Sequence, residues 1–299
     1  MVGLTRRQFL LTGAAVGLLG IEAVAQPVTP PRVQLPDGSR VPALGMGSWH
    51  LAEGRHAASQ EEEALRTGIS LGMALIDTAE AYGLTHGRAE QMIGRVIAGQ
   101  RDKVFLVSKV SPGHATASGI RKACKASLAR LGTEYLDLYL LHARRLGMDL
   151  GVVVRSFESL RADGHIRRWG VSNFRVRHME DLYRVRGGDA CTTNQVRYNL
   201  GARGIERDLL PWCDRHSVPI MAYSPLGMGE LLGNAALIRV AERHQCSPAA
   251  IALAWTIRSG HVISIPESGS PAHVRENAVA QSLRLTDLDL GELNQAFPA

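Results

Sequence analysis

The sequence predicts a single α/β domain, a (β/α)8 barrel with an N-terminal β-hairpin, on three observations. Short apolar runs recur along the chain, and each is followed by an amphipathic stretch. The ends of successive runs are 23 to 42 residues apart, which fits a strand followed by a crossover helix. The chain has 299 residues, and one such barrel of about 250 residues would take up nearly all of it.

Eight apolar runs are the predicted strands. They span residues 44–48, 74–77, 104–109, 138–142, 169–173, 192–195, 219–224 and 262–266. Before them, residues 33–41 form a predicted hairpin with an Asp37-Gly38 turn, which could plug one mouth of the barrel. A doubly wound sheet is the alternative fold, but no G-x-G-x-x-G pattern follows an early strand.

Two of the intervening stretches illustrate why helices are expected there. Acidic residues 61–63 follow Ser59, as suits a first helical turn, and apolar positions come after them. Between Ala117 and Leu131 apolar side chains recur every three or four residues, which places them on one helical face. Met228 is expected to be a packing residue.

The composition is that of a globular protein. The chain is 45% hydrophobic and 21% charged, which excludes a disordered or collagen-like chain. The formal net charge is +6, yet no Lys/Arg-rich run suits a phosphate backbone, so a nucleic-acid partner is not expected. The four cysteines form no C-x-x-C pair and no metal-ligand pattern. We expect buried thiols, with a disulfide as the alternative, and no bound metal.

The N-terminus resembles an export signal. Arg6 and Arg7 precede a short apolar stretch, and Ala25 ends a small-residue cleavage pattern. Paired arginines are typical of a twin-arginine signal, which exports folded proteins. We therefore expect residues 1–25 to be a signal peptide that the twin-arginine machinery reads, and residues 26–299 to be a barrel domain in the periplasm. An inefficient signal would leave the protein in the cytoplasm.

Polar residues stand at the carboxyl ends of the strands, where a (β/α)8 barrel builds its active site. Asp77, Lys109 and His142 end three consecutive strands, and Tyr82 follows Asp77 in the next loop. A buried lysine needs a partner, so Asp77 and Lys109 form a predicted ion pair, which would suit a purely structural role as well. A cation beside Tyr82 lowers the pKa of the phenol, which can then donate a proton to a carbonyl oxygen. His142 could orient that carbonyl by a hydrogen bond.

None of these side chains is a nucleophile, and no metal cage accompanies them. The group that attacks the carbonyl carbon must therefore come from a cofactor, and hydride transfer is the chemistry that fits. The pattern predicts an enzyme that acts on a small-molecule carbonyl substrate.

On these motifs the sequence resembles the aldo-keto reductase family, from about residue 33 to residue 285. The similar segments are DTAEAYG at 77–83, LVSKV at 106–110, LYLLH at 138–142, GVSNF at 170–174, NQV at 194–196 and AYSPLG at 222–227. The resemblance implies a TIM barrel that reduces aldehydes and ketones, closest to the bacterial methylglyoxal- and aldehyde-reducing members. It implies Tyr82 as the general acid, with Lys109 and Asp77 as its charged neighbours. It also implies that His142 orients the substrate.

The same resemblance implies NADP(H) as the cofactor, with NAD(H) as the alternative. It assigns Ser172, Asn173 and Gln195 to the nicotinamide carboxamide. It assigns Tyr223 to stacking on the nicotinamide ring. The other residues implied in cofactor binding are Gly47, Ser48, Trp49, Ser224, Leu226, Gly227, Ser268, His273, Glu276 and Asn277.

Two of the departures from the family's pattern concern the cofactor and the substrate. Glu267 and His273 stand where the family commonly has Lys and Arg, the cations that meet the 2′-phosphate of NADPH. A carboxylate there favours a ribose hydroxyl over a phosphate, so we expect NADH to be used within about a factor of ten of NADPH. Arg144 and Arg145 follow His142, and at the pocket rim they would grip carbonyl substrates that carry an acid group.

Two other functions stay open at this point. One is a non-catalytic nucleotide-sensing module, against which the complete set of Asp77, Tyr82, Lys109 and His142 argues. The other is an exported oxidoreductase that retains its cofactor and recycles it between two substrates. We expect the protein to be a monomer.

Overall fold

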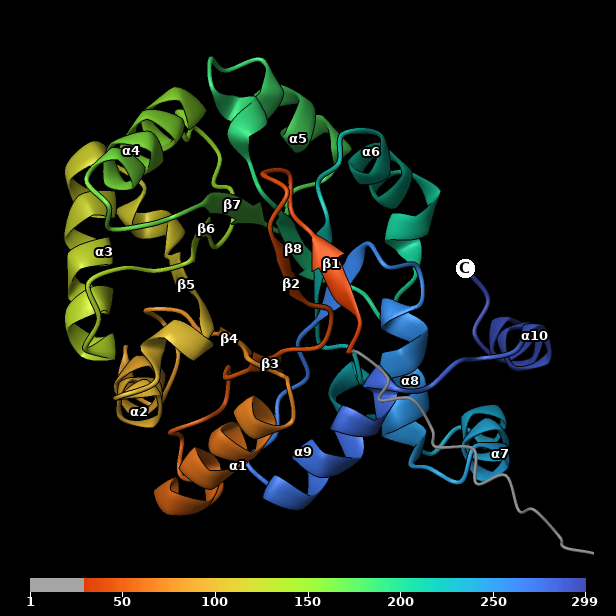
Figure 1. The fold of residues 1–299 in the computed structure, drawn as a ribbon. Helices are drawn as coiled ribbons and strands as arrows, with labels where there is room; N and C mark the ends of the chain where they lie inside the picture. Colours follow the sequence, from red (N-terminus) through yellow and green to blue (C-terminus); the bar gives the residue numbers. More distant parts are fainter. Residues whose placement is uncertain (1–29) are drawn as a thin grey trace, which may run out of the picture.

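Eight parallel strands form one sheet at the centre of the molecule, and the helices surround it (Figure 1). The computed structural model describes residues 30–299, so the predicted signal peptide, residues 1–25, lies outside the described residues. The strands are β3 (Met46–Gly47), β4 (Leu75–Asp77), β5 (Phe105–Val110), β6 (Leu138–Leu141), β7 (Trp169–Ser172), β8 (Asn194–Arg197), β9 (Ile220–Tyr223) and β10 (Val262–Ser264). Each stands where an apolar run predicted a strand.

The two edge strands of the sheet meet, which closes the barrel. The strands neighbour one another in chain order from β3 to β10. Leu44 bridges to Ser264 and Gly47 to Glu267, and the Ser264 N–H donates to the Ala43 carbonyl at 2.7 Å. A doubly wound sheet would leave two open edges, so the (β/α)8 prediction is confirmed.

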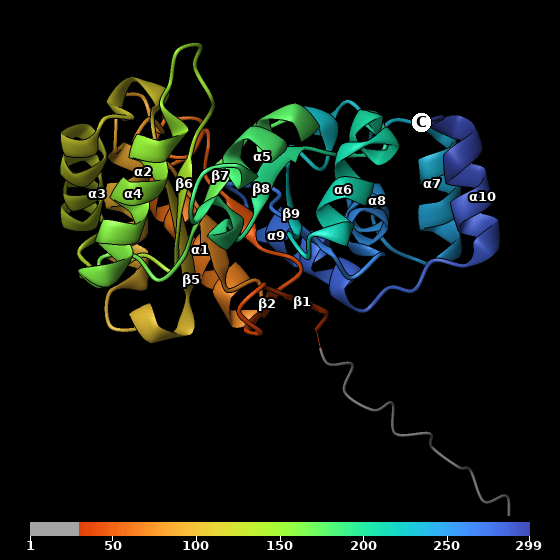
Figure 2. The same cartoon turned by 90° about the horizontal axis from the view of Figure 1, so that it is seen from above.

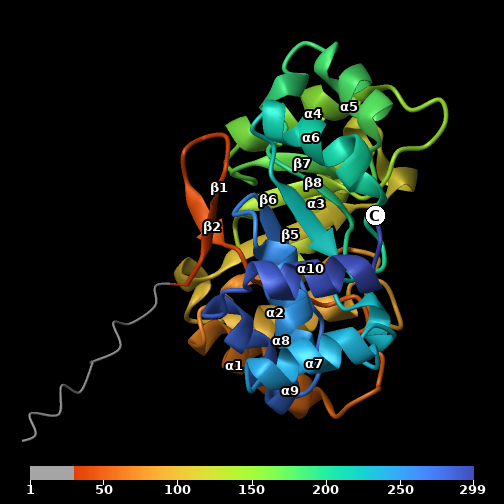
Figure 3. The same cartoon turned by 90° about the vertical axis from the view of Figure 1, so that its right-hand side faces the viewer.

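The predicted hairpin covers one mouth of the barrel, at the lower side of the molecule in Figure 2 and at its left side in Figure 3. It consists of β1 (Arg32–Gln34) and β2 (Arg40–Pro42), which pair antiparallel. Val33, Leu35 and Val41 are buried and pack against the apolar side chains that fill the barrel. The hairpin leaves the opposite mouth, at the carboxyl ends of the strands, uncovered.

Alternation along the strands separates two apolar layers. The inward layer fills the barrel and consists of Leu75, Val107, Leu138, Leu140, Met221, Ile263 and Ile265. The outward layer packs against the helices and includes Ile76, Leu106, Tyr139, Leu141, Val171, Ile220 and Val262. Side chains alternate with a period of two, so every second residue of a strand points into the barrel, and we call these positions the inward file. The inward file is apolar inside the barrel and polar at the open mouth. The polar residues are Asp77, Lys109, His142, Tyr223 and Glu267.

The helices cover the outer face of the barrel. They are α1 (Ala58–Ser70), α2 (Arg88–Ile97), α3 (Ala117–Leu131), α4 (Leu150–Ala162), α5 (Val176–Tyr183), α6 (Leu209–Arg215), α7 (Ala235–Arg243), α8 (Pro248–Ile257), α9 (Pro271–Ala278) and α10 (Asp287–Ala296). The bounds of α3 agree with the prediction, and the Thr116 side chain caps it by accepting the Gly119 N–H. Within residues 30–299, no helix combines the length and apolar character that a membrane span requires.

All four cysteines carry free thiols, so the disulfide alternative is not realised. Cys124, Cys191 and Cys213 are buried, as predicted, whereas Cys246 is only half-buried.

Candidate active site

A cavity of about 620 Å³ lies at the open mouth of the barrel. Twelve of the predicted site residues line it. They are Gly47, Ser48, Trp49, Asp77, Tyr82, His142, Ser172, Asn173, Gln195, Tyr223, Ser224 and Leu226. These residues come from six different strand ends, so closure of the barrel is what brings them together.

Lys109 is the centre of the polar network at the base of this cavity. Its side chain is fully buried, and its Nζ donates to Asp77 Oδ2 at 2.7 Å, to the Thr78 carbonyl at 3.0 Å and to the Tyr82 hydroxyl at 3.1 Å. An ammonium group has three N–H donors, so every one has a partner. The structure thus contains the predicted ion pair and places the tyrosine on the same ammonium.

The charges of this network are set by burial and by close partners. Burial disfavours the ammonium of Lys109, but the Asp77 carboxylate and the Tyr82 oxygen outweigh it, so the pKa of Lys109 is raised. Burial also raises the pKa of Tyr82, and the lowering effect of Lys109 only partly offsets it. The expected lowering of the Tyr82 pKa is therefore wrong, because burial outweighs the effect of Lys109. Asp77 cancels much of the field of Lys109, and the phenol stays protonated at neutral pH.

His142 faces Tyr82 across the cavity. Its Nε2 lies 3.5 Å from the Tyr82 hydroxyl, and the two rings meet edge to face with centroids 5.6 Å apart. Burial and the nearby Lys109 lower the pKa of His142 to about 4. The imidazole is therefore neutral at physiological pH, and a neutral imidazole keeps one N–H that can donate to a substrate oxygen.

Amide side chains tie the neighbouring strand ends to this network. Gln195 Nε2 donates to Asp77 Oδ1 at 2.7 Å, so both carboxylate oxygens of Asp77 accept a hydrogen bond, one from Gln195 and one from Lys109. The Ser172 hydroxyl donates to the Gln195 carbonyl at 2.9 Å. Asn173 Nδ2 donates to the His142 carbonyl at 3.2 Å, and Asn173 Oδ1 accepts from the Tyr223 hydroxyl at 3.0 Å. Asn173 Nδ2 also donates to the Ser172 hydroxyl at 3.1 Å, so the three predicted carboxamide residues are connected to one another and, through Gln195, to Asp77.

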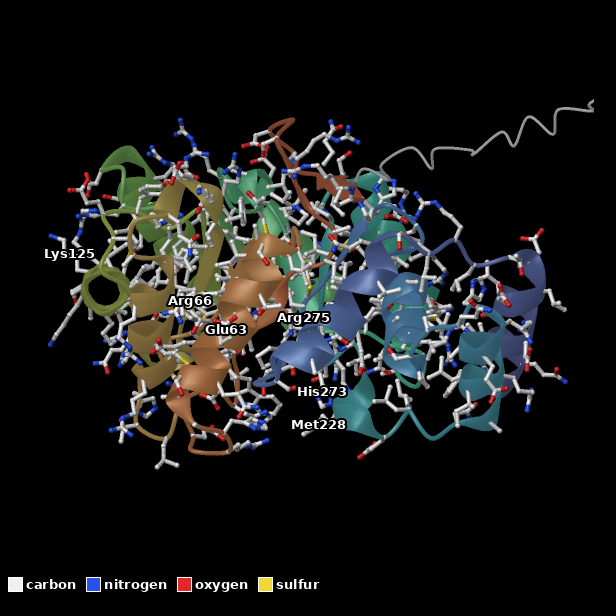
Figure 4. The ribbon with its side chains drawn as sticks, turned by 60° about the horizontal axis from the view of Figure 1, so that its bottom comes forward. Glu63, Arg66, Lys125, Met228, His273 and Arg275 are labelled. Atoms are coloured by element: carbon white, nitrogen blue, oxygen red, sulfur yellow. The ribbon has the colours of Figure 1, made fainter. Side chains whose placement is uncertain are left out.

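Five predicted cofactor residues lie outside the cavity lining. Gly227 is buried in the turn beside the cavity, and the other four lie on α9 and the segment that precedes it. Those four are Ser268, His273, Glu276 and Asn277. His273 is exposed on α9, and Asn277 is buried on the same helix. Figure 4 shows His273 and Arg275 on α9, above Met228 in that view. Their assignment to the cofactor stays a prediction.

Several residues that line the cavity were not among the predicted site residues. His50, Arg55, Met228 and Glu267 belong to this group. Glu267 accepts the His50 N–H at 2.8 Å and lies 3.2 Å from His50 Nδ1. The sequence singled out Glu267 only as a departure from the family's pattern. Its position two residues beyond Ile265, on the inward file, is a signal that could have placed it at the cavity. Met228 was expected to pack in the core, but it is 66% exposed at the rim.

The two arginines after His142 do not reach the cavity. Arg144 donates to Asp181 Oδ2 at 2.7 Å, and neither Arg144 nor Arg145 lines the cavity wall. A carboxylate on α5 thus takes the place that a substrate acid group was expected to fill, and Arg55 is the arginine that borders the cavity.

The residues present suit a dinucleotide with a nicotinamide ring. The cavity has an aromatic wall at Tyr223 and Trp49, polar amides at its floor and a volume usual for cofactor sites. The turn that borders it has positive φ at Ser224, Gly227 and Met228. A Cβ at Gly227 would lie 2.8 Å from the Leu231 side chain, so this turn needs bare backbone. Such turns present main-chain N–H groups that suit phosphate oxygens.

Comparisons with known proteins identify similar sequences and structures. A model of the aldo/keto reductase family matches residues 43–297. Methylglyoxal reductase YeaE of Escherichia coli K12 is 45% identical over 272 residues, which cover 89% of this chain and 95% of the relative. An aldo/keto reductase from Klebsiella pneumoniae, crystallised with NADP and acetate, is 44% identical with a TM-score of 0.86, over 90% of this chain and 96% of that one. The thermostable aldo-keto reductase Tm1743, crystallised with the inhibitor epalrestat, is 33% identical with a TM-score of 0.81, over 89% and 99%.

Proposed function

Because this chain belongs to the aldo/keto reductase family, we propose that it reduces aldehydes and ketones to alcohols, with Tyr82 as the proton donor. As a member of that family it is an NAD(P)H-dependent oxidoreductase. The observation that carries the proposal is the contact of the Tyr82 hydroxyl with both Lys109 Nζ and His142 Nε2 at the base of the cavity. A carbonyl oxygen beside that hydroxyl would meet two donors at once.

Tyr82 supplies the proton that the carbonyl oxygen takes up as its carbon is reduced. Burial keeps the phenol protonated, which is the form a general acid needs. The Lys109 ammonium, 3.1 Å away, stabilises the negative charge that develops on the phenol oxygen as the proton leaves. Asp77 holds that ammonium in place through a 2.7 Å bond.

His142 orients the substrate, because its neutral ring can donate one hydrogen bond to the same carbonyl oxygen. Ser172, Asn173 and Gln195 would hold the carboxamide of the cofactor, and Tyr223 would pack against its ring. When bound, NADPH supplies the hydride for the carbonyl carbon.

The substrate class that we propose is small aldehydes and dicarbonyls of the methylglyoxal type. The proposal is supported by the E. coli relative named methylglyoxal reductase, to which nearly the whole chain is similar. Trp49 and Tyr82 line the same cavity, and a short carbonyl compound fits between such aromatic walls.

Replacement of Tyr82 by Phe tests the proposal. We expect kcat for methylglyoxal to fall by about 10²- to 10⁴-fold, because the proton donor is removed. The affinity for NADPH should stay unchanged. Tyr135→Phe is the matched control, since Tyr135 stacks against Arg101 outside the cavity. A Tyr82→Phe variant with more than about a tenth of the wild-type kcat would contradict the role of Tyr82.

Measurements of NADPH binding and of turnover on the wild-type protein separate the two rival functions. A nucleotide-sensing module would bind NADPH without turnover of any simple aldehyde. An oxidoreductase that retains and recycles its cofactor would follow ping-pong kinetics with two substrates.

We propose that the protein is exported through the Arg6-Arg7 signal, with part of its activity supported by retained cofactor. Cell fractionation of the native chain and of an Arg6→Lys, Arg7→Lys variant tests the export. The native chain should be found in the periplasm and should keep a bound nucleotide through gel filtration. The variant should stay in the cytoplasm. Activity confined to the cytoplasm in both would contradict export, and periplasmic protein free of nucleotide would contradict retention.

A further inference from the structure

Glu80 takes no part in the reaction proposed above, although it lies between Asp77 and Tyr82. Its side chain is 9% exposed, and its Oε1 accepts two hydrogen bonds. One comes from the Ser111 N–H at 2.6 Å and the other from His114 Nδ1 at 2.9 Å. Both partners belong to the segment that follows β5, the strand that carries Lys109. A buried carboxylate thus connects the two segments that meet at the proton donor.

The connection continues the pairing of β4 with β5 beyond the end of β4. The Thr78 N–H donates to the Val107 carbonyl at 2.9 Å, and the Glu80 N–H donates to the Lys109 carbonyl at 3.3 Å. Just beyond the end of β5, the Ser111 N–H donates to the Glu80 carboxylate instead of a main-chain carbonyl. A side chain therefore supplies the last bond between the two segments.

This last bond stands where the chain turns towards the cavity. The Tyr82 N–H donates to the Ala79 carbonyl at 3.1 Å, which closes a turn around Glu80. The position of the Tyr82 hydroxyl relative to Lys109 Nζ then depends on how firmly this turn is held against the end of β5. One side-chain oxygen that accepts from both Ser111 and His114 is well suited to hold it.

We propose that Glu80 is a positioning residue for the general acid, whose carboxylate fixes the turn carrying Tyr82 to the end of the strand carrying Lys109. The inference rests on the proposed role of Tyr82. The proposed role of Glu80 depends on the two hydrogen bonds and not on its charge, and both bonds are accepted by the same oxygen. An amide oxygen in Glu80→Gln can accept both of them, whereas Glu80→Ala removes both.

Three variants of the full chain test the inference. We expect Glu80→Ala to lower kcat by about 10- to 100-fold, since small misplacements of a catalytic group cost that much. The dissociation constant for NADPH, measured by fluorescence, should stay within about twofold, and the isotope effect with deuterated cofactor should rise because the chemical step becomes slower. We expect Glu80→Gln to recover kcat to within about threefold of wild type. In a crystal structure of Glu80→Ala, the distance from Lys109 Nζ to the Tyr82 hydroxyl should exceed 3.1 Å.

Asp137→Ala is the matched control, because the Asp137 carboxylate accepts a main-chain N–H at the opposite end of β5, away from Lys109. Asp137 Oδ2 accepts the Leu106 N–H at 2.9 Å and a bond from Arg101 at 2.7 Å. Asp137→Ala should lower the melting temperature and leave kcat within about twofold of wild type. A merely structural role for Glu80 would give the same result in Glu80→Ala, which would overturn the inference.

Two further outcomes would also overturn it. Equal losses of kcat in Glu80→Gln and Glu80→Ala would show that the charge of Glu80 matters and its hydrogen bonds do not. An unchanged distance between Lys109 and Tyr82 in the Glu80→Ala crystal structure would remove the geometric basis. Retention of activity by Tyr82→Phe would contradict the proposed function itself, and loss in Tyr82→Phe with none in Glu80→Ala would contradict only the role of Glu80.

Discussion

His142 should make the folded protein less stable as the pH falls below neutrality. The folded-state pKa of this imidazole is about 4, lowered from an ordinary 6.5 by burial and by Lys109. As the pH falls through 6.5, the unfolded chain takes up a proton that the folded chain refuses until the pH approaches 4. Stability is therefore lost across that window and changes no further below it. Between pH 7 and pH 5 the loss from this one group is about 2 kcal/mol.

The His142→Gln variant removes the titrating group and keeps a side chain that can donate a hydrogen bond. Urea unfolding, followed by tryptophan fluorescence at pH 7 and pH 5, gives the free energy of unfolding for each protein. Wild type should lose about 2 kcal/mol more than the variant between the two pH values. His86→Gln, at an exposed histidine, should lose as much as wild type. If wild type and His142→Gln lost the same free energy, the imidazole would not be held neutral by the fold, and its role as a neutral donor would fail.

Three further outcomes are expected. Lys109→Met leaves the Asp77 carboxylate buried without its cation, so the free energy of unfolding in urea should fall by about 3 kcal/mol, and turnover should be lost; a variant as stable as wild type would contradict this. Glu267→Lys replaces a carboxylate in the cavity wall by a cation, so the ratio of kcat/KM for NADPH over NADH should rise at least about tenfold, and an unchanged ratio would place Glu267 away from the 2′-phosphate. Alanine at both Arg144 and Arg145 should leave the kcat/KM ratio of acidic to neutral aldehydes within about twofold, because Arg144 is bound to a carboxylate on α5; a larger change would restore their predicted role at the rim.

The fold and the identity of the central residues could be predicted from the sequence because they depend on short-range patterns. The alternation of side chains along a strand has a period of two whatever the surroundings, so Asp77 and Lys109 had to continue the inward file of their strands. The spacing between runs required a crossover helix after each strand, and parallel strands bring their carboxyl ends to one mouth. The same alternation could have placed Glu267, two residues after Ile265, at the mouth, although the sequence singled it out only as a departure from the family's pattern.

Only the tertiary structure decided how these residues behave. The direction of the Tyr82 pKa shift depends on the balance between burial and a lysine that Asp77 already neutralises, and burial has no local signature in the sequence. Arg144 turned to a carboxylate on α5, and Glu267 turned to the His50 N–H, 217 residues away along the chain. Such pairings follow from which loops the closed barrel brings within hydrogen-bond distance. The sequence by itself therefore determined which groups reach the mouth of the barrel, whereas their charge states and partners were decided by packing, because desolvation and hydrogen bonding act between groups that only the fold makes neighbours.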